Sequence, residues 1–443
     1  MRAGIDPTLL DLRFLSDRNL QDDALVREAV AAVARLEPDL VGLYCNSAVF
    51  PFLSEFATAI RERLPGAHIT LGGPHATFLS QEILDFNKSI DSIVRGEAEI
   101  TLLELIRSLQ TDNRQLDKIA GLSYRNNSHV FHNKSRRPLS NVDELPIPDF
   151  TLFPALQTYQ SERRKIFVPI LGSRGCPFNC SFCAARAMWG HQRRRDPHEV
   201  ITEMKVRMCA YGVDIVFGFL DDEFTCSRQW VTSVCDGIRR EKLHTQWTAF
   251  SRVDTVSPDL LRRLRDSGCI NLYYGIESGS QKVLDSMNKG FSTVRAIQTV
   301  RDTLKAGIEP TASFILGFPN ETTEDMSKTI DLAVQMTEIG ARVHLFPFCV
   351  LPGTPLWDSN VQVTRVPNFK HLTLGPKRPF ITKYSHIQWC VPDAWVCKLK
   401  GISPDSFQKI FEFALETVMR AHSTTARSAA AMSKASNLGR QNF

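Results

Sequence analysis

Apolar segments alternate with amphipathic helical segments through most of this chain, and they fall into two series. The first series begins with an apolar run at residues 38–45, followed by a helical pattern at 51–64. This alternation is typical of a parallel sheet covered by helices. The sequence therefore predicts an α/β fold that begins with a Rossmann-like parallel sheet. Further strands of this sheet are expected at residues 68–75, 89–96 and 119–125.

A proline-rich segment at residues 143–154 ends the first series and is typical of an interdomain linker. The second series contains six strand–helix units, which predict a partial (β/α)6 barrel of the TIM type. In such barrels the chemistry gathers at the C-terminal ends of the strands. The six strands are expected at residues 165–173, 214–220, 246–251, 270–276, 311–318 and 341–348. Helix starts are predicted at Asp196 with Pro197, Ser257 with Pro258, and Thr322 with Asp325.

These patterns divide the chain into five parts. Residues 1–145 are expected to form the N-terminal domain, 146–165 the linker and 166–360 the barrel. A helical C-terminal extension is expected over 361–422, and the small, polar tail at 423–443 is predicted to be disordered.

A CxxxCxxC loop formed by Cys176, Cys180 and Cys183 directly follows the first expected barrel strand. Thiolates are the usual ligands of iron–sulfur clusters, and a cubane normally takes four of them. With only three local cysteines, a fourth iron is left open to bind the amino and carboxylate groups of a methionine moiety. The alternative is a structural zinc loop, but zinc sites usually pair CxxC with a second pair or with histidines, which are absent at suitable spacing.

Charge and hydropathy exclude two classes of partner. The formal net charge of +5, from 53 Lys and Arg against 48 Asp and Glu, is too small and too dispersed for a nucleic-acid surface. No stretch approaches the roughly 18 apolar residues of a membrane span, and the first residues lack the apolar core of a signal peptide. We therefore expect a cytoplasmic protein, in which eleven cysteines indicate metal or redox chemistry more than disulfides.

Over most of residues 10–360 the chain resembles the radical S-adenosylmethionine (SAM) superfamily, in the group with an N-terminal cobalamin-binding-type domain. The cluster loop, including Phe182, carries the resemblance together with seven further motifs. The resemblance implies an enzyme with a 4Fe-4S cluster and SAM, supplied with electrons by flavodoxin or ferredoxin. The motifs are GGPH at 72–75, RGEAE at 95–99, FLDDEF at 219–224, GIESGS at 275–280, MNKG at 287–290, FILGFP at 314–319 and LPGTPL at 351–356.

The resemblance also implies positions for residues that bind SAM. Asp222 and Glu223 would lie near the SAM amino group, and Glu277 would contact its ribose or methionyl portion. Arg252 would meet the SAM carboxylate or a neighbouring aspartate. For the three acids, the alternative is an ordinary carboxylate at a strand end.

The adenine of SAM is expected to lie against Gly317, Phe318 and Glu321, where glycine lets the backbone approach the ring closely. These residues follow the fifth barrel strand.

Cobalamin is a possible third cofactor, and its candidate contacts are Ser47, Gly72, Gly73 and His75. The chain has no DxHxxG loop, so ligation of cobalt by a histidine from below is not expected. Residues 9–14 resemble the second strand of such a domain, so its first strand and loop are expected either to be missing or to belong to an upstream start. In the alternative interpretation, the GGPH segment is only a tight strand-to-helix turn in a vestigial domain.

Cys349 lies just past the last barrel strand and is the candidate catalytic residue. Its thiol could hold a thiophilic acceptor such as arsenite, with Cys390 and Cys397 nearby in sequence. The alternative is a buried packing cysteine, the commoner fate of a free thiol. The five cysteines outside the motifs are expected to serve packing; they are Cys45, Cys209, Cys226, Cys235 and Cys269.

The predicted reaction is modification of a small metabolite by transfer of a SAM-derived group, with a methyl group moved through cobalamin as the first hypothesis. The alternatives are transfer of the 3-amino-3-carboxypropyl group and radical cyclisation or rearrangement. A non-catalytic cofactor-binding sensor would keep the fold but has no need of a complete SAM cleft. The tRNA-modifying methylthiotransferases are disfavoured, because the N-terminal domain holds only Cys45 where they carry three cysteines.

Overall fold

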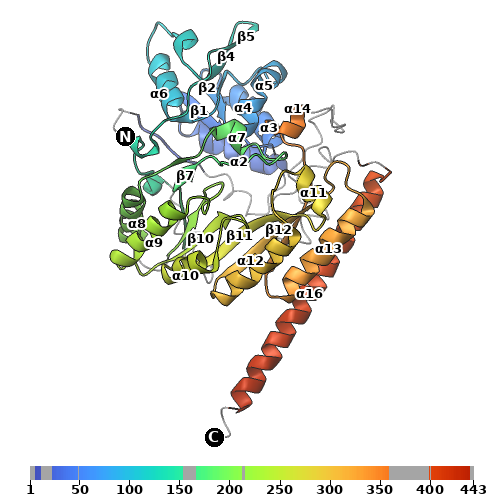
Figure 1. The fold of residues 1–443 in the computed structure, drawn as a ribbon. Coiled ribbons are helices and arrows are strands. Elements are labelled where there is room, and N and C mark those ends of the chain that lie inside the picture. The colour runs from blue at the N-terminus through green and yellow to red at the C-terminus, as the bar shows by residue number, and fades with distance from the viewer. Residues whose placement is uncertain are drawn as a thin grey trace.

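The computed structural model contains two α/β units, one above the other, and a long C-terminal helix that runs along the second (Figure 1). The two units correspond to the two series of strands and helices predicted from the sequence. The structure describes residues 5–10, 22–47, 49–152, 166–211, 215–358, 399 and 401–439.

The N-terminal unit is built on a five-stranded sheet in the order β1-β2-β3-β4-β5. The first three strands are parallel, as predicted, but β4 and β5 are antiparallel to their neighbours. For β5 the reason is that only two residues separate it from β4, and so short a connection can join only antiparallel strands. The strands are β1 (Leu40–Tyr44), β2 (His68–Gly72), β3 (Ser92–Val94), β4 (Leu122–Asn126) and β5 (His129–His132).

Helices cover this sheet, and the first described helix precedes β1. The strand expected at residues 9–14 lies mostly outside the described residues. The helices are α2 (Asp22–Ala34), α3 (Phe50–Arg63), α4 (Pro74–Phe78), α5 (Ser80–Phe86), α6 (Ala98–Leu109) and a 3₁₀ turn, Leu116–Lys118.

The second unit is a six-stranded, wholly parallel sheet whose strands follow chain order from β6 to β13. Parallel strands in chain order, each joined to the next by a helix, give the open barrel that the sequence predicted. All six expected strands are present. They are β6 (Ile166–Ile170), β9 (Ile215–Phe219), β10 (Gln246–Ser251), β11 (Cys269–Glu277), β12 (Glu309–Leu316) and β13 (Arg342–Pro347).

The barrel helices begin where the sequence signals predicted. The side chain of Ser257 caps α10 by accepting a hydrogen bond from Leu260 N, and Thr322 with Asp325 forms a capping box on α13. The longer helices are α8 (Pro197–Tyr211), α9 (Arg228–Arg240), α10 (Pro258–Asp266), α11 (Gln281–Ser286), α12 (Thr293–Lys305) and α13 (Thr323–Glu338). The shorter elements are β7 (Ser173–Arg174), α7 (Ala185–Trp189), β8 (Arg193–Arg194) and α14 (Pro355–Asp358).

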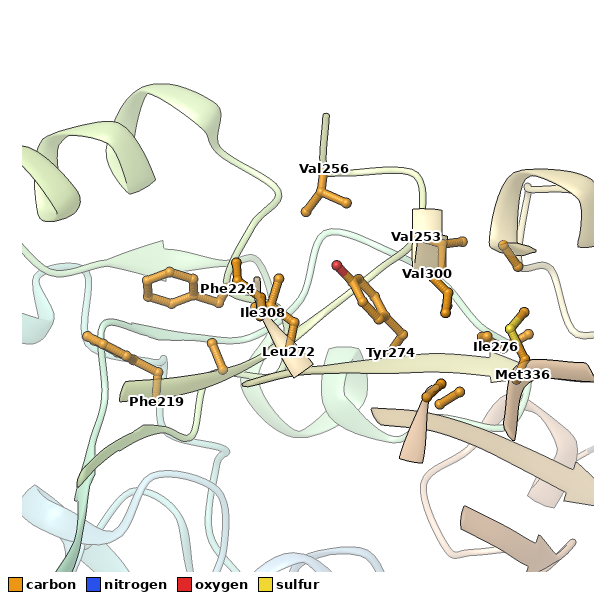
Figure 2. Close-up of a cluster of buried hydrophobic side chains, with 14 of the residues drawn as sticks. Phe219, Phe224, Val253, Val256, Leu272, Tyr274, Ile276, Val300, Ile308 and Met336 are labelled. Atoms are coloured by element: carbon orange, nitrogen blue, oxygen red, sulfur yellow. The ribbon is translucent and has the colours of Figure 1, made fainter. Parts of the chain in front are cut away.

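Alternate residues of each barrel strand point to opposite faces of the sheet. On β11, Leu272, Tyr274 and Ile276 are buried under the helices, where they meet Phe219 and Met336 (Figure 2). The intervening residues of the strands therefore line the concave face of the barrel. Fully burying an apolar side chain of this size stabilises the fold by about 1.5–3 kcal/mol, so this layer dominates the stability of the barrel.

The C-terminal helix α16 (Pro404–Gly439) packs along α13 and buries Phe407, Phe411 and Leu415 in the barrel core (Figure 1). It continues to Gly439, through most of residues 423–443, the segment for which the sequence predicted disorder. This tail is rich in alanine, the best helix former, and contains no proline or glycine before Gly439.

Several sequence predictions fall outside the described residues. They include most of the C-terminal extension before residue 399, with Cys390 and Cys397, and the linker beyond Leu152. Within the described residues, no helix combines the length and the apolar character needed to cross a bilayer.

Candidate active site

The cysteine loop runs between β7 and α7 at the C-terminal end of β6. Segments distant in sequence fix its backbone: Ser181 N donates to Met287 O at 3.1 Å, and Leu356 N donates to Ser181 O at 3.3 Å. The side-chain amide of Asn288 donates to Asn179 O at 2.8 Å. Two of the motifs noted in the sequence, MNKG and LPGTPL, thus serve to hold the cysteine loop.

The three loop thiols form a donor set suited to an iron–sulfur cluster. Among the described residues, no three His, Cys, Asp or Glu side chains stand close enough to hold a single metal ion. Three thiolates are three of the four ligands that a 4Fe-4S cubane normally takes. Burial raises the pKa of Cys176 to about 12 and that of Cys183 to about 11, so both thiols are neutral unless a metal binds.

Arg252, at the end of β10, reaches the cysteine loop. Its guanidinium Nη1 lies 3.8 Å from Cys180 Sγ, and its Cζ lies 3.8 Å from the centre of the Phe178 ring. Both of its other donor groups bind the Asp254 carboxylate at 2.9 Å. Of the two partners expected for Arg252, the structure therefore shows the neighbouring aspartate.

Three consecutive acids after β9 take different positions. Asp222 is exposed beside the cysteine loop, and partial enclosure raises its pKa. Glu223 is buried and accepts hydrogen bonds through one oxygen from Thr225 and Thr255, so it braces the loop that follows β9. Of the two acids expected near the SAM amino group, only Asp222 is open to a ligand.

Asp221 is a buried acid that the sequence did not single out. It accepts hydrogen bonds from Gly172 N at 3.0 Å and from Ser173 Oγ at 2.5 Å, and so fixes the approach to the cysteine loop. Burial raises its pKa to about 7. Asp221 was visible in the sequence as one of the three acids of the FLDDEF motif. The motif alone does not show which of these acids faces a ligand and which only supports the loop.

Glu277 forms a buried ion pair with Lys289, whose Nζ lies 3.2 Å from Glu277 Oε1. Both side chains are almost fully buried. Glu277 also has a φ of +77°, a left-handed conformation that is strained for a residue with a side chain. Strain at the C-terminal end of a barrel strand supports a functional role for this acid. Lys289, in the MNKG motif, was missed as a site residue.

Gly317, Phe318 and Glu321 do come together after β12. Glu321 Oε2 accepts hydrogen bonds from Gly317 N at 2.5 Å and Phe318 N at 3.0 Å, while its Oε1 is buried without a hydrogen-bond partner among the described residues. Burial raises the pKa of Glu321 to about 7. Gly317 has a φ of +89°, and a Cβ there would meet the Phe407 ring of α16 at 2.7 Å. Glu321 therefore acts as a clamp on the glycine loop.

Replacing Glu321 by glutamine should remove part of the pH dependence of stability. Because the folded-state pKa of about 7 exceeds that of an exposed glutamate, the unfolded chain releases this proton first as the pH rises. The contribution is complete below about pH 4.5 and is lost as the pH rises through 7, by at most about 3 kcal/mol. Urea unfolding at pH 5 and pH 8 should show a smaller difference for Glu321→Gln than for wild type. The exposed neighbour Glu324→Gln is the control, and an unchanged pH dependence in Glu321→Gln would contradict the assignment.

The four candidate cobalamin residues lie together at the C-terminal ends of β1 and β2. Ser47 Oγ and His75 Nδ1 are 3.0 Å apart, and the His75 ring lies 4.7 Å from that of Phe50. Burial lowers the pKa of His75 to about 4, which keeps the ring neutral and within the domain core. Gly73 has a φ of +102°, and a Cβ there would come within 2.6 Å of Cys45 O. The second glycine of GGPH is thus required by the turn itself.

Beside this turn, the Tyr44 side chain at the end of β1 is 68% exposed. Tyr44 was not predicted as a contact residue, because an apolar run marks a strand but not the side chain that emerges at its end.

Contacts between the two units place the GGPH turn near the cysteine loop. The Phe78 ring of α4 occupies the space beside Gly353, in the LPGTPL motif that also bonds to Ser181. Buried Glu97 pairs with Arg193 at 2.5 Å and with Arg174 at 3.7 Å. Glu97 of the RGEAE motif therefore holds the first unit against the second through these ion pairs.

Cys349 lies just after β13 and is partly exposed. Burial raises the pKa of its thiol, so the thiolate that would bind a soft acceptor is disfavoured at neutral pH. Its catalytic role stays a prediction. Of the cysteines expected to serve packing, Cys45, Cys235 and Cys269 are buried, whereas Cys209 is exposed and Cys226 is partly exposed.

Two family models match the chain. Residues 170–333 match the Radical SAM superfamily, and residues 2–106 match the B12 binding domain. The first match spans the cysteine loop and the strands from β9 to β12, and the second spans β1 to β3 with the GGPH turn.

Relatives of known sequence include methyltransferases and cyclases. An uncharacterized methyltransferase of Pyrococcus horikoshii is 33% identical over 76% of this chain and 73% of its own length. The anaerobic magnesium-protoporphyrin IX monomethyl ester cyclase of Cereibacter sphaeroides is 30% identical over 70% of this chain and 52% of its own length. This chain therefore spans about half the length of that cyclase.

Two solved structures share the fold. The radical SAM methyltransferase TsrM from Kitasatospora setae, with cobalamin and a [4Fe-4S] cluster bound, matches with a TM-score of 0.64 at 18% identity, over 82% of this chain and 70% of that one. The cobalamin-dependent radical enzyme OxsB, with aqua-cobalamin and SAM bound, matches with a TM-score of 0.61 at 19% identity, over 72% of this chain and 46% of that one.

Proposed function

The chain belongs to the radical SAM superfamily, among the members with an N-terminal B12 binding domain, and from that membership we propose that it methylates a small metabolite. Radical SAM enzymes use a 4Fe-4S cluster and SAM, and the B12 binding domain adds cobalamin. When bound, the cluster supplies the electron that cleaves SAM, and cobalamin supplies a carrier for the methyl group.

The observation that carries this proposal is that one segment of the chain contacts both candidate cofactor sites. The LPGTPL segment contacts Phe78, just after the GGPH turn, and also donates a backbone hydrogen bond to Ser181 in the cysteine loop. The Glu97 ion pairs hold the same two units together. A methyl carrier at the GGPH edge would thus lie close to SAM at the cysteine loop, as methyl transfer between them requires.

In this proposal, different residues bind the cluster, SAM and cobalamin. Cys176, Cys180 and Cys183 would hold the cluster. Asp222, which lies beside the cysteine loop, would accept hydrogen bonds from the SAM amino group. The buried Glu277–Lys289 pair would orient the rest of SAM, because two fixed charges in a dry site align a zwitterion without reorganisation. Ser47, Gly73 and the exposed Tyr44 ring would contact cobalamin.

Product analysis tests the proposal without knowledge of the substrate. The reconstituted full-length enzyme is incubated anaerobically with SAM and a strong reductant, with and without hydroxocobalamin, beside protein-free controls. We expect S-adenosylhomocysteine that requires both enzyme and cobalamin, because a methyl carrier is recharged from SAM, together with 5′-deoxyadenosine. Methylthioadenosine as the main product would contradict methyl transfer and indicate aminocarboxypropyl transfer.

Cyclisation is the second candidate, because a relative at 30% identity is a cyclase. In that case SAM would yield 5′-deoxyadenosine with no S-adenosylhomocysteine above the protein-free control. The two product patterns therefore separate the candidates.

A further inference from the structure

Aromatic rings line the concave face of the barrel sheet. Phe250 of β10 contacts Tyr273 of β11, with ring centres 5.1 Å apart. Tyr273 in turn lies 5.8 Å from His344 of β13, which lies 6.2 Å from Phe346. Phe167 of β6 lies on the same face at the far edge of the sheet, and we call these five residues together the aromatic floor.

Small residues make room for these rings. The Phe167 ring occupies the place that a Cβ at Gly218 of β9 would take, so glycine leaves room for this ring over the neighbouring strand. On β12, Ser313 stands in register with His344, and Thr311 with Tyr273. Because these side chains are short, the rings of β11 and β13 meet across the strand between them. Both features indicate a surface shaped for rings.

Two rings of the aromatic floor are exposed and the other three are half-buried, unlike the fully buried opposite face of the same strands. Phe167 is 50% exposed and Phe250 is 41% exposed, while Leu272 on the helix side is fully buried. Leu171 and Leu220 extend the open apolar area toward the β6 edge, where they also line a cavity of about 280 Å³. A concave apolar surface of this kind is typical of ligand sites, since leaving it in water costs free energy.

The floor lies directly below the candidate chemistry. Phe250 precedes Arg252 by two residues, so the two side chains leave β10 on the same face, and Arg252 reaches Cys180. Tyr273 is in register with Phe250 and precedes Gly275 by two residues on β11. A Cβ at Gly275 would come within 3.3 Å of Lys289 Nζ. A molecule resting on the rings would therefore present its upper edge to SAM.

We propose that the aromatic floor binds the substrate, and that this substrate is a planar, conjugated ring compound. The proposal rests on the proposed function for what happens to that compound. Planarity follows from the rings: an aromatic ligand gains offset-stacked or edge-to-face contacts beyond the burial of its surface, and a saturated ligand of the same size does not. The row of contacting rings from β10, β11 and β13 suits a flat body better than a flexible chain.

A matched pair of probes tests the ring preference. The cluster-reconstituted full chain is titrated by calorimetry with 2-naphthoate and with decahydro-2-naphthoate, which share charge and carbon skeleton. We expect 2-naphthoate to bind more tightly, and Phe250→Leu to weaken it roughly threefold to tenfold while changing the saturated probe little. The control is Phe86→Leu, an exposed ring on α5 that should leave both affinities unchanged.

Equal affinity for the two probes, or equal effects of Phe250→Leu and Phe86→Leu, would overturn the proposal. So would a large fall in the unfolding midpoint of Phe250→Leu, because it would show that another part of the chain covers the floor. SAM cleavage is measured on the same samples. If the ring preference is absent while SAM is still cleaved, only this inference is contradicted. If the ring preference is present while SAM is not cleaved, only the proposed function is contradicted.

Discussion

Replacing Cys180 by alanine should remove the 4Fe-4S cluster and lower SAM cleavage by more than roughly a thousandfold. The loop supplies only three thiols, so losing one leaves two protein ligands for a cluster that already has one open iron. Arg252 Nη1, now 3.8 Å from Cys180 Sγ, would also lose the partner it approaches. Visible absorbance, electron paramagnetic resonance and 5′-deoxyadenosine formation measure the effect.

Cys209→Ala is the matched control for this change. Cys209 is exposed on α8, away from the loop, and its loss should leave both the cluster spectrum and SAM cleavage at wild-type levels. A Cys180→Ala protein that keeps a full cluster and cleaves SAM at the wild-type rate would disprove the ligand assignment.

The place of the cysteine loop could be predicted because its evidence is local. Three cysteines within eight residues, directly after a β-strand, indicate an iron–sulfur cluster and put the loop at the C-terminal end of the barrel. The six barrel strands were predictable for the same reason, since each is a short apolar run followed by a marked helix start, as at Ser257 and Thr322.

The rest of the site depends on contacts that no local pattern contains. The MNKG motif was visible, but nothing in it shows that Lys289 reaches Glu277 inside the barrel. Likewise, FLDDEF presents three acids, and only the fold separates exposed Asp222 from Asp221 and Glu223, which brace loops. The strand at β4 was predicted but its antiparallel direction was not, because an apolar run marks a strand without giving its direction. The short strand β5 was not predicted.

Lys289→Met should be the most damaging single change outside the cluster ligands. It leaves the Glu277 carboxylate buried beside no cation, which costs about 3–5 kcal/mol of stability. Glu277→Gln should also destabilise the fold, because it leaves the ammonium group without its partner. Anaerobic urea unfolding of the cluster-loaded proteins measures both effects. Lys328→Met breaks an exposed pair with Glu324 and should cost less than about 1 kcal/mol, which makes it the control.

The double variant Lys289→Met/Glu277→Gln separates stability from function. With both charges gone, most of the lost stability should return, giving a coupling energy of about 2 kcal/mol or more. SAM cleavage should stay as low as in the single variants, because the proposed orientation of SAM needs both charges. Recovery of activity together with stability would show that the pair only holds the barrel mouth together. Additive losses in the double variant would show that the two side chains do not interact.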